Sequence, residues 1–216
     1  MKNVKHIAIV GAGGLGREVL AAIAACNEAR KEWNVLGFLD SNRNLIGSEV
    51  GGVPVLGGDD WVPKNHDDSV WFVCGIGDPK VRFRVAEEFR GQGRKFASIV
   101  HPGVRIPTSV RIGTGTVVMA GTQFTTDANV GSHVVVYINC GITHDVEIGD
   151  FCVIAAGCNL SGGAVLETGA QLGTAASVLP RRRIGAWTTI GAGSVVTEDI
   201  PADKIAAGIP CRVIQK

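Results

Sequence analysis

Residues 142–172 read ITHDVEIGDFCVIAAGCNLSGGAVLETGAQL, and every sixth residue of this stretch, starting with the first, is isoleucine or leucine. The same spacing runs without insertion from Val100 to Val196, and all seventeen positions hold valine, isoleucine, leucine or phenylalanine. An α-helix cannot present this period on one face, because it turns once in about 3.6 residues. The spacing predicts a β-solenoid in which each hexapeptide supplies one short strand and one corner.

A second position, four residues after each large apolar one, holds mostly small side chains. It includes Cys140, Cys152 and Cys158, which we expect to fill the core beside the large residues. The chain has no C-x-x-C pair, and the cysteine spacing gives no disulfide or metal pattern.

Residues 1–99 follow a different pattern. Strand-like runs at 6–11, 34–40, 69–77 and 95–100 alternate with helix-like segments at 16–31 and 78–93. They predict a small Rossmann-like βαβαβ domain over residues 1–99, with three or four strands. The solenoid is expected over residues 100–200 and a C-terminal tail over 201–216.

The composition is that of a globular protein, with 45% hydrophobic and 19% charged residues. A formal net charge of +1 gives no global attraction to nucleic acid or to an anionic membrane. We find neither a signal peptide nor an apolar run of the roughly 18 residues that a spanning helix needs. A cytoplasmic location is expected.

The six-residue period resembles that of the hexapeptide-repeat acyltransferases, which fold as left-handed parallel β-helices. The resemblance implies that three hexapeptides close one triangular coil, so that residues 18 apart stack on neighbouring coils about 4.8 Å apart. By this rule His144 and Asp145 lie against Gly162 and Gly163. An imidazole titrates near neutral pH, and an adjacent carboxylate fixes its tautomer. Bare glycine amides are able to hold an oxyanion. The alternative is a solvated corner histidine with a chance acidic neighbour.

The segment INCGITHDVEIGDF, residues 138–151, resembles the catalytic segment of bacterial nucleotide-sugar N-acetyltransferases of the bacillosamine pathway and of the related sialic-acid O-acetyltransferases. The resemblance covers essentially the whole chain, including the ending GIPCRVI. It implies that His144 is the general base, that Asp145 strengthens it, and that the Gly162 amide lies near the acetyl carbonyl. It also places Asn139 in the acceptor site.

The same resemblance implies acetyl-CoA as the acyl donor. Val153 stands where some members carry a second histidine that touches the donor, which is a departure from the family pattern. The later donor contacts of the family map to Thr174 and Ala192.

The loop GAGGLG contains the pattern G-x-G-x-x-G at Gly11, Gly13 and Gly16, between a predicted strand and a predicted helix. The helix N-terminus suits a pyrophosphate, although the glycines could serve only a tight turn. In the resembled family this domain holds the nucleotide of a sugar substrate. The residues implied are Gly13, Gly14 and Leu15 at the phosphates, Asp40 and Ser41 at the nucleoside, and Gly77 beside them.

The stretch PRRRIG, residues 180–185, breaks the apolar rhythm with Arg181, Arg182 and Arg183. It is either a solvated bulge or an arginine cluster that contacts a coenzyme A phosphate. No metal is expected, because His101 and His133 do not stack with His144 and the H-x4-H pair of zinc-binding solenoids is absent.

Together these features predict acetyl transfer from acetyl-CoA to the amino group of a nucleotide-linked amino-deoxysugar, with UDP or GDP as the nucleotide. Two alternatives stay open: O-acetylation of a sugar hydroxyl of the sialic-acid type, and a non-catalytic nucleotide-sugar-binding protein. Similar acyltransferases are homotrimers with sites between neighbouring solenoids, so a homotrimer is expected.

Overall fold

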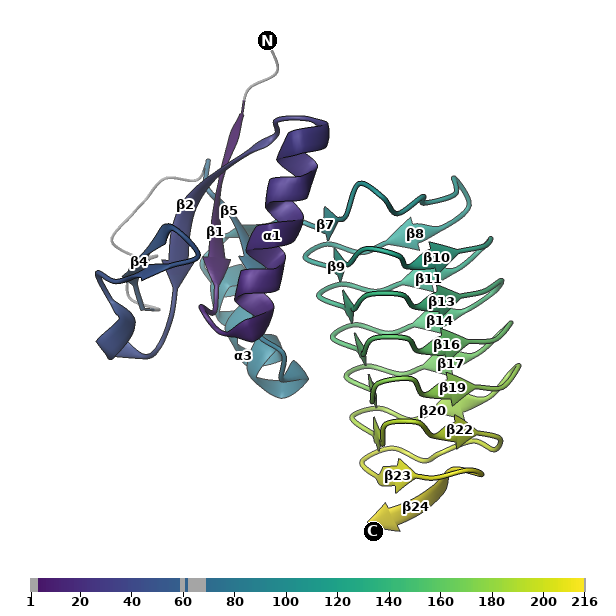
Figure 1. Cartoon of the computed structure of the whole chain (residues 1–216). Helices are drawn as coiled ribbons and strands as arrows, with labels where there is room; N and C mark the ends of the chain where they lie inside the picture. Colours follow the sequence, from purple (N-terminus) through teal and green to yellow (C-terminus); the bar gives the residue numbers. More distant parts are fainter. Residues whose placement is uncertain (1–3, 59–60, 62–68, 216) are drawn as a thin grey trace. The chain divides into compact units, whose positions relative to one another are not determined.

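The computed structural model describes residues 4–58, 61 and 69–215. The chain divides into two compact units, Met1–His101 and Pro102–Lys216. The first is an α/β unit and the second a parallel β-helix (Figure 1). The predicted fold class, an α/β domain followed by a left-handed parallel β-helix, is confirmed.

The α/β unit is built on a six-stranded sheet in the order β3-β4-β2-β1-β5-β6, in which all pairs but β3–β4 are parallel. Buried apolar residues of β1 and β5 form the centre of its core. No helix in the described part of the chain is long and apolar enough to cross a membrane. The elements are β1 (Lys5–Val10), α1 (Gly14–Ala29), β2 (Trp33–Leu39), η1 (Arg43–Leu45), β3 (Glu49–Val50), β4 (Val53–Gly57), β5 (Trp71–Cys74), α3 (Pro79–Gly91), β6 (Lys95–Phe96) and β7 (Ile99–Val100).

The expectation of three or four strands in this unit was wrong, because the hairpin β3–β4 extends the sheet. Gly51 and Gly52 form its turn with φ of +59° and +79°. Two consecutive residues with positive φ are what a tight hairpin turn requires, and glycine adopts them at low cost. The Gly-Gly pair between Val50 and Val53 was the signal in the sequence.

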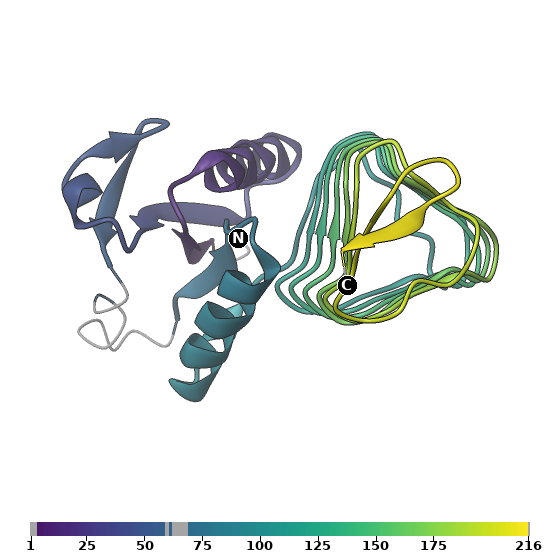
Figure 2. The same cartoon turned by 90° about the horizontal axis from the view of Figure 1, so that it is seen from below.

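The strands β8 to β22 of the β-helix have two residues each, recur every six residues and stack in parallel, and at the C-terminal end β24 pairs antiparallel with β23. Gly141 pairs with Asn159 and Ile142 with Leu160, which is the predicted 18-residue register. Seen along its axis in Figure 2, the β-helix has the cross-section of a rounded triangle. The first face holds β10 (Gln123–Phe124), β13 (Gly141–Ile142), β16 (Asn159–Leu160), β19 (Ser177–Val178) and β22 (Val195–Val196). The second face holds β8 (Arg111–Ile112), β11 (Asn129–Val130), β14 (Glu147–Ile148), β17 (Val165–Leu166) and β20 (Arg183–Ile184). The third face holds β9 (Val117–Val118), β12 (Val135–Val136), β15 (Val153–Ile154), β18 (Gln171–Leu172), β21 (Thr189–Ile190), β23 (Ile205–Ala207) and β24 (Arg212–Gln215).

Several of the small inward side chains of the β-helix also form hydrogen bonds to the backbone. At five of these positions a hydroxyl or a thiol donates to the backbone carbonyl 15 residues further on, which satisfies a buried acceptor. All six cysteines are free thiols. The donors and acceptors are Thr116 Oγ1 to Gly131 O (2.8 Å), Thr122 Oγ1 to Tyr137 O (2.9 Å), Cys140 Sγ to Ala155 O (3.2 Å), Cys152 Sγ to Glu167 O (3.0 Å) and Cys158 Sγ to Gly173 O (3.1 Å).

Each corner of the triangle contains one residue with positive φ per coil, and these residues form three columns along the axis. Corner 1 joins the β13 face to the β14 face, corner 2 joins the β14 face to the β15 face, and corner 3 joins the β12 face to the β13 face. The columns are Asp127, Asp145, Gly163 and Arg181 at corner 1; Gly115, His133, Phe151, Gly169 and Trp187 at corner 2; and Gly121, Asn139, Gly157, Ala175 and Gly193 at corner 3.

Candidate functional site

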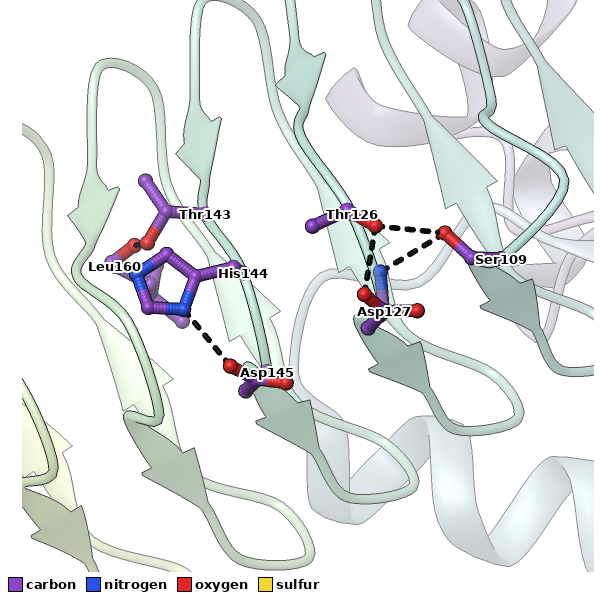
Figure 3. A network of polar contacts seen from close by, with 7 residues as sticks. All are labelled: Ser109, Thr126, Asp127, Thr143, His144, Asp145 and Leu160. Atoms are coloured by element: carbon purple, nitrogen blue, oxygen red, sulfur yellow. Dashed lines mark hydrogen bonds and ion pairs between the residues drawn. The ribbon is translucent and has the colours of Figure 1, made fainter.

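His144 and Asp145 form an ordered pair at corner 1 (Figure 3). The Nδ1 atom of His144 lies 2.8 Å from Oδ2 of Asp145, and the two side chains are 62% and 69% exposed. Asp145 has a φ of +59°, so the chain turns there and its carboxylate meets the imidazole of the preceding residue. A carboxylate at Nδ1 favours the tautomer that carries its proton there, which leaves Nε2 as an exposed acceptor.

The neighbouring coil offers bare backbone to this imidazole. A Cβ atom added at Gly162 would collide with the ring of His144, so the ring lies directly against this glycine. The Gly163 N–H donates to the carbonyl of His144 at 3.0 Å, whereas the Gly162 N–H has no acceptor in the described part of the chain. Gly162 therefore provides a free donor beside the exposed imidazole nitrogen.

On the other side of His144, the preceding coils carry a polar cluster that the sequence interpretation missed (Figure 3). Thr126 Oγ1 donates to Asp127 Oδ2 at 2.7 Å and lies 3.0 Å from Ser109 Oγ. Ser109 Oγ also accepts from the Asp127 N–H at 3.1 Å. Counting 18 residues back from His144 and Asp145 would have found Thr126 and Asp127. The cluster adds a second carboxylate to corner 1.

The structure separates Asn139 from His144 within one chain. Asn139 lies at corner 3 and His144 at corner 1, at opposite ends of the strand β13. Five residues of extended chain span roughly 16 Å. The positions implied for the acyl donor lie on the same side as Asn139: Thr174 and Ala192 directly precede corner-3 residues, and Val153 begins β15, which leads to that corner. No single corner of one chain holds all of these residues.

In the α/β unit, the glycines of the loop GAGGLG divide into two groups. A Cβ atom at Gly16 would collide with the carbonyl of Gly11, and Gly11 itself has a φ of +100°. These two glycines are required by packing and by the turn. Gly13 and Gly14 have no atom within 4 Å of an added Cβ, so nothing in the described protein demands a glycine there. Gly13 precedes α1 without a side-chain cap, which leaves free amides at the helix N-terminus. Open space and free amides are what a bound anion requires.

Asp40 is fixed beside this loop. Its Oδ2 accepts from the Ala12 N–H and its Oδ1 from the Asn42 N–H, both at 2.8 Å. With Ser41 it lines a cleft of about 210 Å³ at the carboxyl ends of β1 and β2. This edge of an open parallel sheet is where ligands bind in doubly wound folds. Leu15 is buried, so only its backbone could serve a ligand.

The remaining wall of the cleft comes from the helix α3 and its preceding loop. Val81, Arg84 and Val85 line it from one face of the helix, and the sequence interpretation had missed them. Their i, i+3, i+4 spacing after the N-cap Asp78 was the available signal. The buried Arg82 donates from Nη1 to the carbonyls of Ile76 (2.6 Å) and Gly77 (3.0 Å). It thereby fixes the loop that closes the cleft.

Elsewhere, no group of three or more histidine, cysteine, aspartate or glutamate side chains with metal-binding geometry occurs among the residues that the structure describes.

Comparison with solved structures gives matches along the whole chain. PerB from Caulobacter crescentus, in complex with CoA and GDP-perosamine, is 30% identical, with a TM-score of 0.89 and coverage of 98% of both chains. The acetyltransferase domain of PglB from Neisseria gonorrhoeae FA1090, in complex with acetyl coenzyme A, is 28% identical, with a TM-score of 0.90 and coverage of 98% of this chain and 100% of that one. WeeI from Acinetobacter baumannii AYE is 26% identical, with a TM-score of 0.85 and coverage of 96% and 99%.

Sequence comparisons add shorter matches. The family model described as the PglD N-terminal domain matches residues 6–89. A putative acetyltransferase from Staphylococcus aureus (strain COL) is 55% identical over 40 residues, or 18% of this chain and 20% of the relative. Galactoside O-acetyltransferase from Escherichia coli (strain K12) is 49% identical over 45 residues, or 21% and 22%. The chain thus matches only about a fifth of the length of these curated relatives.

Proposed function

Because the chain belongs to the hexapeptide-repeat nucleotide-sugar N-acetyltransferases, we propose that it transfers an acetyl group from acetyl-CoA to the amino group of a nucleotide-linked amino-deoxysugar. The observation that carries this proposal is the arrangement at corner 1. An imidazole oriented by a carboxylate at 2.8 Å lies against a glycine whose N–H is free. A general base, its orienting group and an oxyanion donor are what acyl transfer to an amine needs.

In the proposed mechanism, Nε2 of His144 accepts a proton from the substrate amine as the nitrogen forms a bond to the thioester carbonyl carbon. The Gly162 N–H donates to the carbonyl oxygen, which carries the developing negative charge. Asp145 stabilises the imidazolium that forms. When the carbon–sulfur bond breaks, the imidazolium returns its proton to the departing thiolate, so that the base is regenerated.

The choice of an amine over a hydroxyl acceptor is supported by the charge at corner 1. Asp127 and Asp145 lie on neighbouring coils, and both carboxylates are exposed. A protonated amine is attracted to such a pair and releases one proton to solvent before the neutral amine attacks, whereas a neutral hydroxyl gains no such attraction. GDP-perosamine, the ligand in the PerB complex, is a nucleotide-linked amino sugar.

For the nucleotide, we propose the cleft of the α/β unit. Gly13, Gly14 and the backbone of Leu15 would hold the diphosphate, and Asp40 and Ser41 would face the nucleoside. Gly77 would contribute through the loop fixed by Arg82. Arg84 would add the one positive charge among the lining residues. Open space at Gly13 and Gly14 supports this use of the loop over a purely structural one.

We further propose a homotrimer whose sites combine corner 1 of one copy with corner 3 of the next. The placement of His144 and Asn139 at different corners of one chain supports this arrangement. Asn139, Val153, Thr174 and Ala192 of one copy would then contact the acceptor and the donor at the His144 of its neighbour.

Mixing two impaired variants tests this assembly. His144→Ala removes the base, and Asn139→Gly removes the corner-3 amide while glycine tolerates the positive φ of 58°. In randomly mixed trimers formed from equal amounts, a site has both intact residues with a probability of about one quarter. We expect co-expressed variants to recover about that fraction of wild-type turnover. Absence of recovery would mean that both residues act in one chain. An Asn139→Gly variant with wild-type turnover on its own would mean that Asn139 has no role.

The central test is a thiol-release assay with acetyl-CoA and a panel of UDP- and GDP-linked amino sugars, followed by mass spectrometry of the product. We expect an acetamide on the sugar, and a decrease in kcat of about 10²–10⁴ in His144→Ala. Nucleotide-sugar binding, measured by calorimetry, should persist in this variant because the cleft lies in the other unit. Product acetylated on a hydroxyl would favour the O-acetyltransferase alternative. Binding without thiol release would favour a non-catalytic protein.

A further inference from the structure

The three consecutive arginines of PRRRIG have different surroundings. Arg183 Nη1 lies 2.8 Å from Oε1 of Glu167. Arg182 Nη1 lies 3.8 Å from Oδ1 of Asp199, and its Nε donates to the Pro180 carbonyl at 3.3 Å. Arg181 is exposed and forms no ion pair with any residue that the structure describes. Of the three, Arg181 alone has its charge available for a ligand.

The carboxylates on the next coil have other partners. Asp199 Oδ1 accepts from the Arg183 N–H at 2.9 Å in addition to its contact with Arg182. Glu198 pairs with Nη2 of Arg212 at 3.2 Å. Arg181 is therefore not neutralised from the C-terminal side.

The position of Arg181 connects it to His144. Arg181 and Asp145 occupy the same column of corner 1 with the same φ of +59°, so their side chains leave the coil in the same direction. Between them lies Gly163, and an added Cβ there would be 3.4 Å from Cγ of Arg181. Two coils correspond to about 10 Å along the axis. The arginine thus borders the gap over Gly162 and Gly163 on the side opposite to His144.

We infer that Arg181 binds a phosphate of the coenzyme A part of the acyl donor, an inference that rests on the proposed function. The sulfur and the first phosphorus of coenzyme A are separated by roughly thirteen bonds, or about 15 Å when extended. An arginine side chain that reaches about 6 Å beyond a backbone position about 10 Å from His144 matches that span. Its planar guanidinium fits a phosphate with two parallel hydrogen bonds.

The charge order along corner 1 supports the assignment. The column runs from Asp127 and Asp145 through the uncharged Gly163 to Arg181. A cationic amine is attracted to the acidic end and an anionic donor to the basic end. The proposed donor positions Thr174 and Ala192 are one coil apart, and Arg181 lies between them in the chain, so the two positions bracket the height of Arg181 along the axis.

The test compares donors with and without phosphates. For Arg181→Ala we expect the KM of acetyl-CoA and the Kd of CoA, measured by calorimetry, to rise about tenfold while kcat changes little. The kcat/KM of S-acetyl-pantetheine, which lacks phosphates, should stay unchanged. Arg183→Ala is the matched control, because it removes the same charge from a residue paired with Glu167. Its CoA affinity should stay within about twofold of wild type.

Several outcomes would overturn the assignment. Wild-type CoA affinity in Arg181→Ala would show that the arginine does not contact the donor. An equal loss with S-acetyl-pantetheine would show a general disturbance of the groove, and a loss confined to the nucleotide sugar would assign Arg181 to the other substrate's phosphates. If the wild-type protein itself binds no CoA, the proposed function fails as well, which distinguishes that failure from a failure of Arg181 alone.

Discussion

Gly162→Ala is the most specific test of corner 1, because the added Cβ would occupy the space of the His144 ring. The backbone at Gly162 does not have positive φ, so alanine fits the chain itself and only the imidazole must move. The ring is largely exposed and can swing outward without leaving a cavity. That movement breaks the 2.8 Å contact with Asp145 and displaces Nε2 from the free amide. We expect kcat to fall by about 10²-fold, within the range that a lost general base gives, while the melting temperature stays nearly constant.

Gly163→Ala is the matched control, one residue away. Its Cβ would meet Arg181 at an ordinary distance of 3.4 Å and would not touch the imidazole, but its φ of +69° disfavours alanine. We expect a loss of about 1–2 kcal/mol in the free energy of unfolding, with kcat much less affected. Steady-state kinetics and thermal melts of both variants measure the two effects separately. A Gly162→Ala enzyme with wild-type kcat would refute the placement of the imidazole and its role.

Three further predictions concern the α/β unit and the thiols. Gly14→Ala should leave the melting temperature unchanged and weaken nucleotide-sugar binding in calorimetry. Gly16→Ala should instead lower the free energy of unfolding by about 1–3 kcal/mol, because its Cβ collides with the backbone. Equal stability of the two variants would contradict the distinction between a glycine that the packing requires and one that leaves space for a ligand. Arg84→Ala should weaken nucleotide-sugar binding about tenfold without changing the KM of acetyl-CoA, and normal binding would remove the arginine from the site. Burial raises the pKa of Cys74 and of Cys158 to about 12 from 9.0, so between these values only the unfolded chain releases the thiol protons. The stabilisation that these two protonated thiols contribute is therefore complete below pH 9 and is lost as the pH rises from 9 towards 12. Cys158→Ala should show a smaller fall in alkaline thermal melts than wild type.

The sequence was sufficient for the β-helix because its order is local. One large apolar residue in every six determines the inward face, and the closed coil then determines which residues stack. The stacking of His144 against Gly162 followed from this period together with the coil of three hexapeptides that the family resemblance implied. The hairpin β3–β4 was missed because strands of two and five residues are too short for a clear alternation of apolar and polar residues, although the Gly-Gly turn was visible.

The parts of the candidate site that were not predicted depend on where the fold places each residue and on which way its side chain points. Asn139 and His144 are five residues apart in the sequence, yet a triangular coil places them at different corners. Arg84 reaches the cleft because of how α3 packs, which its amino-acid type does not reveal. The differing surroundings of the three arginines also depend on the positions of Glu167 and Asp199. None of these carboxylates lies on the 18-residue step from the arginine it pairs with.

Because each coil rises by the same distance, the residues of corner 1 are evenly spaced along the axis. The interval between the base and Arg181 can change only in whole coils, each about 4.8 Å, if the arginine is to keep facing the same groove. A single inserted hexapeptide would advance the chain by one third of a turn and carry the guanidinium to a different corner. Three inserted hexapeptides would return the guanidinium to corner 1 and lengthen its distance from the imidazole by one coil. Enzymes on this scaffold would therefore adapt to longer or shorter donors in discrete increments of 18 residues, while the chemistry at the imidazole stays untouched.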